Sequence, residues 1–186
     1  YDFLPLPDGR WGILIADVSG HGTPAAVIMA VMHSIVHTFP GPPEPPGRVL
    51  TYINEQMTAR YTTNGGTFIT AFYGIYDPSR RSLFYASAGH PPPWLKRCVD
   101  GSVHSLDNTG GLPLGIAAGE VYEEASYTFV PGDQVLFYTD GITEAKNAAG
   151  ELFGADRLDQ ALCACRINAD SLIRVVLDLS LIHISE

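Results

Sequence analysis

WGILIADVSGHGTPAAVIMAVM, residues 11–32, contains the pattern that decides the fold. Its first six residues form a dense apolar run of strand length, and Asp17 follows them directly. Thr23 and Pro24 then supply a helix start, namely a capping hydroxyl and a proline at the first helical position. An acidic side chain at the end of a buried strand is costly unless something positive meets it. The stretch therefore predicts a strand, a loop and a helix, with a positive partner for Asp17.

The rest of the chain continues with strands and helices of ordinary length. We expect helices at about 23–38, 48–61, 157–165 and 170–179, and strands at 67–76, 82–88, 93–96, 121–130 and 134–140. The turn residues DPSRR, 77–81, join two of these strands into a predicted hairpin. Hairpin-joined strands with helices before and after them indicate an α+β fold, with antiparallel sheets layered with helices.

Composition and charge limit the possible functions. The chain of 186 residues fits one domain, and 46% hydrophobic against 17% charged residues is a globular composition. Its 11 basic and 20 acidic residues give a net charge of -9, which disfavours nucleic acid and anionic lipid as partners. Cys98, Cys163 and Cys165 are odd in number and form no disulfide framework. We expect a cytoplasmic domain that does not insert into a membrane, and ordinary thiols rather than a metal site at the C-x-C pair.

Two apolar strands end in the same way. GILIAD, residues 12–17, runs into VSGHG, and VLFYTD, residues 135–140, runs into GITE. We expect the two strands to lie side by side and to bring the carboxylates of Asp17 and Asp140 together, which requires a cation between them. Carboxylate oxygens favour Mg²⁺ or Mn²⁺ over zinc. Two such ions about 4 Å apart can neutralise a phosphoryl group during in-line displacement.

Other interpretations of the polar residues stay open. The SGHG turn is no Walker phosphate loop, because no Gly-Lys-Ser/Thr follows it. A Ser-His hydrolase built on Ser19 and His21 lacks an acid placed to orient the imidazole, although His21 could still donate a proton beside the metals. His33 and His37 lie four residues apart on one helix face, a spacing that can hold a metal. We favour the simpler view that they form the solvated edge of that helix.

Five blocks in this order resemble a known family. The blocks are DVSGHGTPAAVIMA (17–30), TAFYGIYD (70–77), ASAGHPPP (86–93), GGLPLGI (110–116) and PGDQVLFYTDGITEAKNAAGELFG (131–154). Together they resemble the bacterial serine/threonine phosphatases of the PP2C superfamily, in the branch typified by SpoIIE and RsbU. The resemblance covers residues 1–162, and it implies an α-β-β-α sandwich of two antiparallel sheets flanked by helices around a centre of two Mn²⁺ or Mg²⁺ ions.

The resemblance also implies roles for particular residues. Asp17 matches the catalytic aspartate that bridges the two metals, Val18 the position whose backbone carbonyl supports the second metal, and Asp140 another metal-ligating aspartate. The implied reaction removes phosphate from a phosphoserine or phosphothreonine on a regulatory protein, of the type of an anti-sigma-factor antagonist, and so changes sigma-factor availability. The helices of residues 24–61 are implied to couple the site to a partner or to pair in a homodimer. The alternative is that they simply cover a sheet.

The chain departs from the family pattern at both ends. The aspartate that usually opens the pattern would precede Tyr1, and Asp2 matches an acidic residue that is not a ligand; nothing after Leu162 matches the final family aspartate. We expect an incomplete phosphatase domain over residues 1–178, and a non-native tail, LSLIHISE, over residues 179–186. Two other functions stay open. One is a catalytically silent domain of the same fold that binds a regulatory protein. The other is a different metal-dependent phosphohydrolase, for instance one that acts on nucleotides, which is disfavoured because no aromatic or basic residues that could bind a base are evident.

Overall fold

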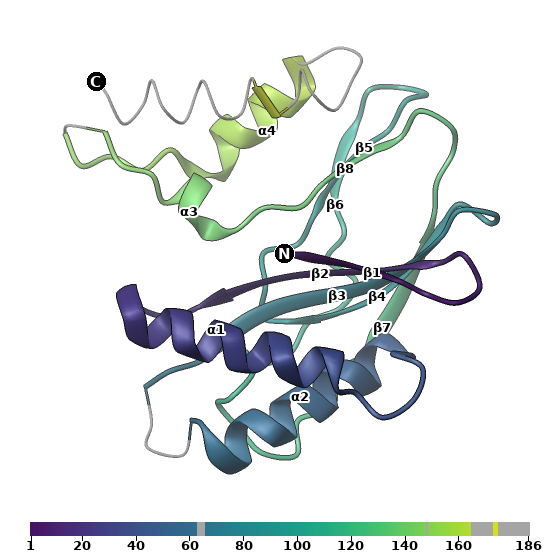
Figure 1. The fold of residues 1–186 in the computed structure, drawn as a ribbon. Helices are drawn as coiled ribbons and strands as arrows, with labels where there is room; N and C mark the ends of the chain where they lie inside the picture. Colours follow the sequence, from purple (N-terminus) through teal and green to yellow (C-terminus); the bar gives the residue numbers. More distant parts are fainter. Residues whose placement is uncertain (63–65, 148, 165–172, 175–186) are drawn as a thin grey trace. The chain divides into compact units, whose positions relative to one another are not determined.

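The computed structural model describes residues 1–62, 66–147, 149–164 and 173–174. By its internal contacts the chain divides into two compact units, one of residues 1–92 and 107–129 and one of residues 93–106 and 130–186. Figure 1 shows the elements of both.

The first unit is built on a five-stranded antiparallel sheet. Its order is β1-β2-β3-β4-β7, with bounds β1 Asp2–Pro5, β2 Trp11–Val18, β3 Ile69–Asp77, β4 Ser82–Ala88 and β7 Glu124–Thr128. The turn between β1 and β2 is closed by a hydrogen bond from the Leu6 amide to the Arg10 carbonyl at 2.9 Å. In the next hairpin, between β3 and β4, the Asp77 carboxylate accepts hydrogen bonds from the Ser79 and Arg80 amides. Short turns of this kind fix the register of the sheet.

Two helices cover one face of this sheet, α1 (Gly22–His37) and α2 (Pro46–Arg60) (Figure 1). In each strand, every second side chain points toward these helices. Leu14 and Val18 of β2 pack in this way into the same core as Ala71 and Tyr73 of β3. Because strand side chains alternate between faces, Asp17 lies on the opposite face, away from the helices. This alternation separates the core from the polar end of β2.

The helix start differs from the predicted one. The N-cap of α1 is His21, whose backbone is extended at φ -146° and ψ 167°, so that Thr23 lies inside the first turn rather than before it. Pro24 is still tolerated there, because the first amides of a helix have no intrahelical acceptor.

The second unit holds a three-stranded antiparallel sheet of order β6-β5-β8, with bounds β5 Trp94–Lys96, β6 Val103–Ser105 and β8 Gln134–Leu136. Two helices accompany it, α3 (Asp140–Thr143) and α4 (Gly154–Ala164). Tyr138, Phe153, Leu158 and Leu162 form a small buried core in this unit.

The prediction of an α+β fold with antiparallel sheets and flanking helices is confirmed. The two aspartate-ending strands do not pair with each other, since β2 lies in the five-stranded sheet and β8 in the three-stranded one. That the carboxylates of Asp17 and Asp140 come together stays a prediction. One edge of β2 pairs with β3 from Trp11 to Val18, and the other pairs with β1 from Trp11 to Leu14. The extent of the domain, 1–178, stays a prediction. The tail, 179–186, and nearly all of the helix expected at 170–179 lie outside the described residues.

Within the described residues, no helix is both long enough and apolar enough to cross a membrane.

A buried asparagine ties α2 to the loop after residue 113. The Asn54 side chain is fully buried; its Nδ2 donates to the Ala117 carbonyl and its Oδ1 accepts from the Gly115 amide, both at 2.8 Å. Buried amide groups left without partners cost free energy, so these two bonds hold the loop on the helix.

We expect Asn54→Ala to lower the free energy of unfolding by about 2–3 kcal/mol, because two hydrogen bonds are lost and the Gly115 amide is stranded. Urea denaturation measures the change. Glu55→Ala, at the exposed neighbouring position of α2, is the matched control and should change stability little. Equal losses in the two variants would contradict the role assigned to Asn54.

Candidate active site

Asp17 lies at the end of a strand that is paired along its whole length. β2 and β3 pair antiparallel from Trp11↔Tyr76 to Val18↔Ile69, and Asp17 stands directly opposite Thr70. The Asp17 residue is half-buried and Val18 is buried. Side chains opposite each other in an antiparallel pair project to the same face, so Asp17 and Thr70 share the face away from α1 and α2.

The loop after Asp17 is fixed to the start of β3 by two hydrogen bonds. The Ser19 amide donates to the Phe68 carbonyl at 2.9 Å, and the Phe68 amide donates to Ser19 Oγ at 2.9 Å. Gly20 and Gly22 have φ values of +95° and +74°, a region that other residues enter only at a cost. The loop therefore has a defined path, which also fixes where the carbonyl oxygen of Val18 lies.

The hydroxyl of Ser19 is thus occupied in holding the loop, which favours a structural role over that of a nucleophile. His21 is exposed and forms the N-cap of α1 without a capping bond from its side chain. Its predicted role as a proton donor stays a prediction.

His90 joins this region, although the sequence analysis assigned it no role. It is 5% exposed, and its Nδ1 lies 3.0 Å from Oγ1 of Thr70, the residue opposite Asp17. Gly89, before it, has φ +65° and approaches Pro113 so closely that an added Cβ would lie 2.8 Å from the proline ring. The signal was present in the sequence as AGHPPP, a histidine directly after a buried strand, but nothing in that motif pointed to Thr70.

Asp140 belongs to the second unit and is held differently from Asp17. Strand β8 ends at Leu136, so Asp140 is not a strand-end residue: it is the first residue of α3, exposed, with Thr139 as the N-cap. Its backbone carbonyl accepts a hydrogen bond from the Glu144 amide at 2.7 Å. A carboxylate in the first turn of a helix is stabilised by the helix dipole. The structure thus groups Asp17, Val18, Thr70 and His90 in one unit and places Asp140 in the other.

Comparison with known proteins identifies the family. Residues 7–181 match the family described as Stage II sporulation protein E (SpoIIE). The chain belongs to the SpoIIE family. Phosphoserine phosphatase RsbU of Bacillus subtilis is 29% identical over an alignment covering 89% of this chain and 49% of RsbU. Protein IcfG of Synechocystis is also 29% identical, over 88% of this chain and 30% of IcfG. This SpoIIE-family chain therefore spans half or less of the length of these relatives.

Solved structures share the fold. The RsbU and RsbW domains of Rv1364c from Mycobacterium tuberculosis superpose with a TM-score of 0.77 at 28% identity, over 99% of this chain and 50% of that one. The SiaA-PP2C domain of Pseudomonas aeruginosa gives a TM-score of 0.80 at 20% identity, over 100% of this chain and 73% of that one. The SpoIIE-family chain thus has a PP2C-like α+β fold with two antiparallel sheets and flanking helices.

The contact between Thr70 and His90 can be tested by an isosteric change. Thr70→Val removes the hydroxyl partner of His90 Nδ1 while keeping the β-branched shape, and we expect a loss of about 1 kcal/mol in the free energy of unfolding. Chemical denaturation measures it. Thr128→Val, at an exposed position of β7, is the control and should be neutral. Neutral behaviour of Thr70→Val as well would show that the contact contributes nothing.

Proposed function

We propose that this chain carries the catalytic centre of a metal-dependent serine/threonine phosphoprotein phosphatase. The observation that supports it most is the fixed end of β2, where Asp17 is followed by a loop bonded to β3, in a chain that belongs to the SpoIIE family. RsbU and a second relative, RsbP of Bacillus subtilis at 27% identity, are both named phosphoserine phosphatases.

The metal ligands we propose are the carboxylates of Asp17 and Asp140 and the backbone carbonyl of Val18. This donor set consists of oxygen atoms alone, which fits Mn²⁺ or Mg²⁺ and not a soft metal. RsbX, whose solved structure has a TM-score of 0.67 at 15% identity, is described in complex with magnesium. Two bound ions would supply Lewis-acid stabilisation of the negative charge that builds up on a phosphoryl group.

The chain's own residues have supporting tasks in this proposal. The bonds between Ser19 and Phe68 hold the backbone of the loop after Asp17, so its carbonyl groups do not have to reorganise during turnover. The contact between Thr70 and His90 stabilises β3, the strand that pairs with β2 at Asp17. With 11 basic against 20 acidic residues, the chain offers little positive charge of its own for a phosphate, which is why the carboxylates must act through cations.

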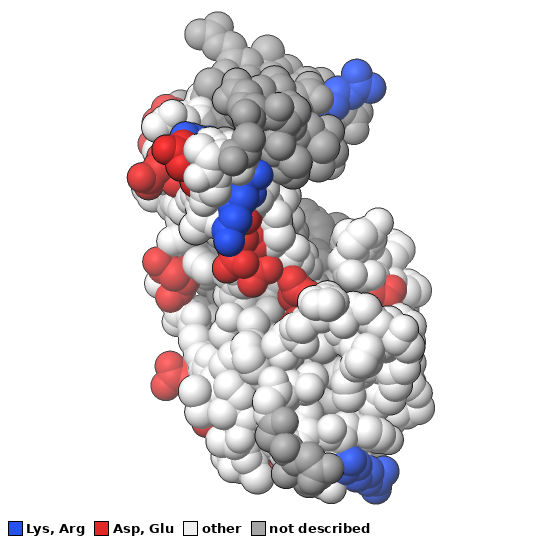
Figure 2. All heavy atoms as spheres, turned by 90° about the vertical axis from the view of Figure 1, so that its left-hand side faces the viewer, with Lys and Arg blue, Asp and Glu red and all other residues white. Residues whose placement is uncertain are grey.

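The substrate we propose is a phosphoserine or phosphothreonine on a regulatory protein of the anti-sigma-factor-antagonist type, in the cytoplasm. We further propose that the helices within residues 24–61 serve for regulation or homodimer formation. Helix α1 contains no Asp, Glu, Lys or Arg, and Val27 on it is 55% exposed. Figure 2 views the molecule from the side where α1 begins and shows a broad area there without charged side chains. A surface of this kind favours contact with another protein over contact with a polyanion.

We expect Asp17→Asn to lower Mn²⁺-dependent phosphate release from an aryl phosphate by at least about 100-fold, since outer-shell changes alone cost 10–100-fold at metal sites. Asp140→Asn should have a similar effect. The assay is run on the full natural protein, with circular dichroism to confirm folding. Asp156→Asn, exposed in the first turn of α4, is the control and should retain activity. Full activity in Asp17→Asn would refute the proposed site.

Substrate class is tested by competition in the same assay. We expect a phosphoserine protein to inhibit aryl phosphate hydrolysis and a nucleotide to have little effect, because no aromatic or basic residues for a base are evident. Stronger inhibition by the nucleotide than by the phosphoserine protein would favour a nucleotide phosphohydrolase. A folded protein with no release from any substrate would favour the silent, partner-binding domain.

A further inference from the structure

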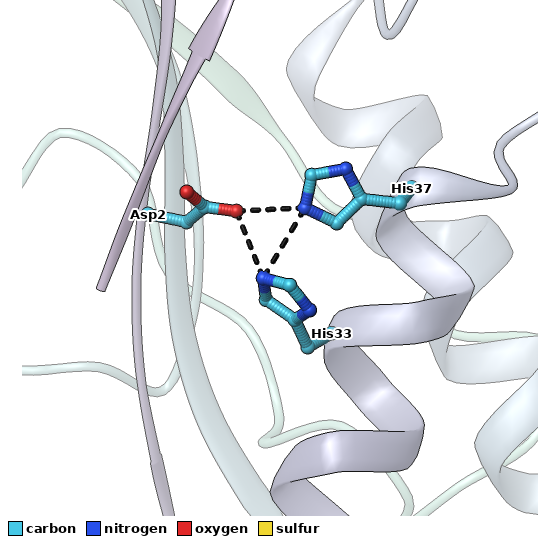
Figure 3. Close-up of side chains that lie close together, drawn as sticks. All are labelled: Asp2, His33 and His37. Carbon is cyan, nitrogen blue, oxygen red and sulfur yellow. Dashed lines mark hydrogen bonds and ion pairs between the residues drawn. The ribbon is translucent and has the colours of Figure 1, made fainter.

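A second cluster of ligand atoms lies on the helix-covered face of the first unit. Asp2 of β1 points toward His33 and His37, which project from the same side of α1 (Figure 3). Asp2 Oδ2 lies 3.0 Å from Nε2 of His33 and 2.8 Å from Nε2 of His37, and the two nitrogens are 3.2 Å apart. Three potential ligand atoms from two elements thus form a closed triangle.

The size of this triangle suits a small tetrahedral ion. Bonds of about 2.05 Å at a tetrahedral zinc separate the ligand atoms by about 3.3 Å. The three observed separations, 2.8 to 3.2 Å, are shorter by only a few tenths of an ångström. A small rotation of the side chains would therefore bring the three ligand atoms to the zinc spacing.

The cluster can be reached from solution. The side chains of His33 and His37 are 54% and 45% exposed, and that of Asp2 is 24% exposed. A cavity of about 350 Å³ lies beside them, with Ala30 and Met32 among its lining residues together with Asp2 and His33. This leaves room for a water molecule or another ligand at a fourth position of the ion.

The ligand chemistry differs from that proposed at Asp17. Two imidazoles and one carboxylate suit Zn²⁺ and neighbouring transition metals, whereas Mg²⁺ prefers oxygen ligands alone.

The sequence of helix α1 fits a site that binds a metal ion but does not catalyse metalloprotease-type hydrolysis. Two histidines at i and i+4 on one helix face are the zinc-binding spacing of metalloproteases, in which a glutamate directly after the first histidine serves as the general base. Here Ser34 stands at that position, so the general base is missing. His33 and His37 are also the sole ionisable side chains of α1.

We propose that Asp2, His33 and His37 form a binding site for a divalent transition ion of the zinc class, which clamps helix α1 to the edge strand β1. The site is separate from the phosphatase centre and does not depend on it. Because α1 begins directly after the loop that follows Asp17, the ion would also restrain the helix that leads away from that loop.

The direct test is titration of the metal-free protein with Co²⁺, followed by visible absorption, and with Zn²⁺ in competition with a chelator. We expect one equivalent to give the intense absorption of tetrahedral Co²⁺, which octahedral oxygen sites lack. His33→Gln and His37→Gln should each bind at least about 100-fold more weakly, since even outer-shell changes cost 10–100-fold. Asp17→Asn should keep the signal, which separates this site from the phosphatase centre.

His104→Gln is the matched control, because His104 is exposed on β6 in the other unit. Absence of the tetrahedral signal, or its survival in His33→Gln and His37→Gln, would overturn the proposal and leave a hydrogen-bonded cluster only. A second readout is thermal unfolding. Zinc should raise the melting temperature of the parent protein and of His104→Gln but not that of His33→Gln, because a ligand that binds the native state alone stabilises it. Equal shifts in all three would also overturn the proposal.

Discussion

The pairing of β2 with β3 is the interaction on which the rest of the structure depends. It runs from Trp11 opposite Tyr76 to Val18 opposite Ile69, and it continues past the strand end through the two bonds between Ser19 and Phe68. One register therefore fixes two things. It places Leu14 and Val18 under the helices, and it places Asp17 on the other face beside Thr70. A slip of one residue would exchange these faces and bury the carboxylate in the core.

The same alternation gives the two faces of the sheet different chemistry. The helix-covered face carries the apolar core and, at its margin, the cluster of Asp2, His33 and His37. The opposite face carries Asp17, whose oxygen atoms suit hard cations and, in our proposal, a phosphoryl substrate. Nitrogen ligands on one face and oxygen ligands on the other would let a single small unit distinguish between two classes of metal ion.

Local sequence signals predicted much of the fold. Strand β4 was predicted at its observed bounds, Ser82–Ala88, because aromatic and apolar residues fill it and the turn before it is rich in polar residues. Strand β8 is shorter than its apolar run: Tyr138, two residues after its end, packs into the small core of the second unit, and Thr139 is the N-cap of α3. The strands β1 and β6 were missed because each is short and is formed through its partner rather than through its own pattern.

For the candidate site, the sequence was a better guide to the choice of residues than to their arrangement in space. The position of Asp17 at the end of a strand could be predicted, because an apolar run of strand length comes directly before it and a loop with two glycines follows it. The two strands that precede Asp17 and Asp140 belong to different sheets, because strand order is set by contacts between segments distant in the sequence, which no local pattern encodes. The contacts of His90 and His33 were missed for a related reason: their partners, Thr70 and Asp2, are far away in the sequence.

The measurement that tests the central claim most directly is a crystal structure of the protein with Mn²⁺, located by anomalous scattering. Our account predicts an anomalous peak about 2.1–2.2 Å from a carboxylate oxygen of Asp17, with the Val18 carbonyl and the Asp140 carboxylate around the same metal centre. Ordered Mn²⁺ bound elsewhere, with none at Asp17, would contradict it.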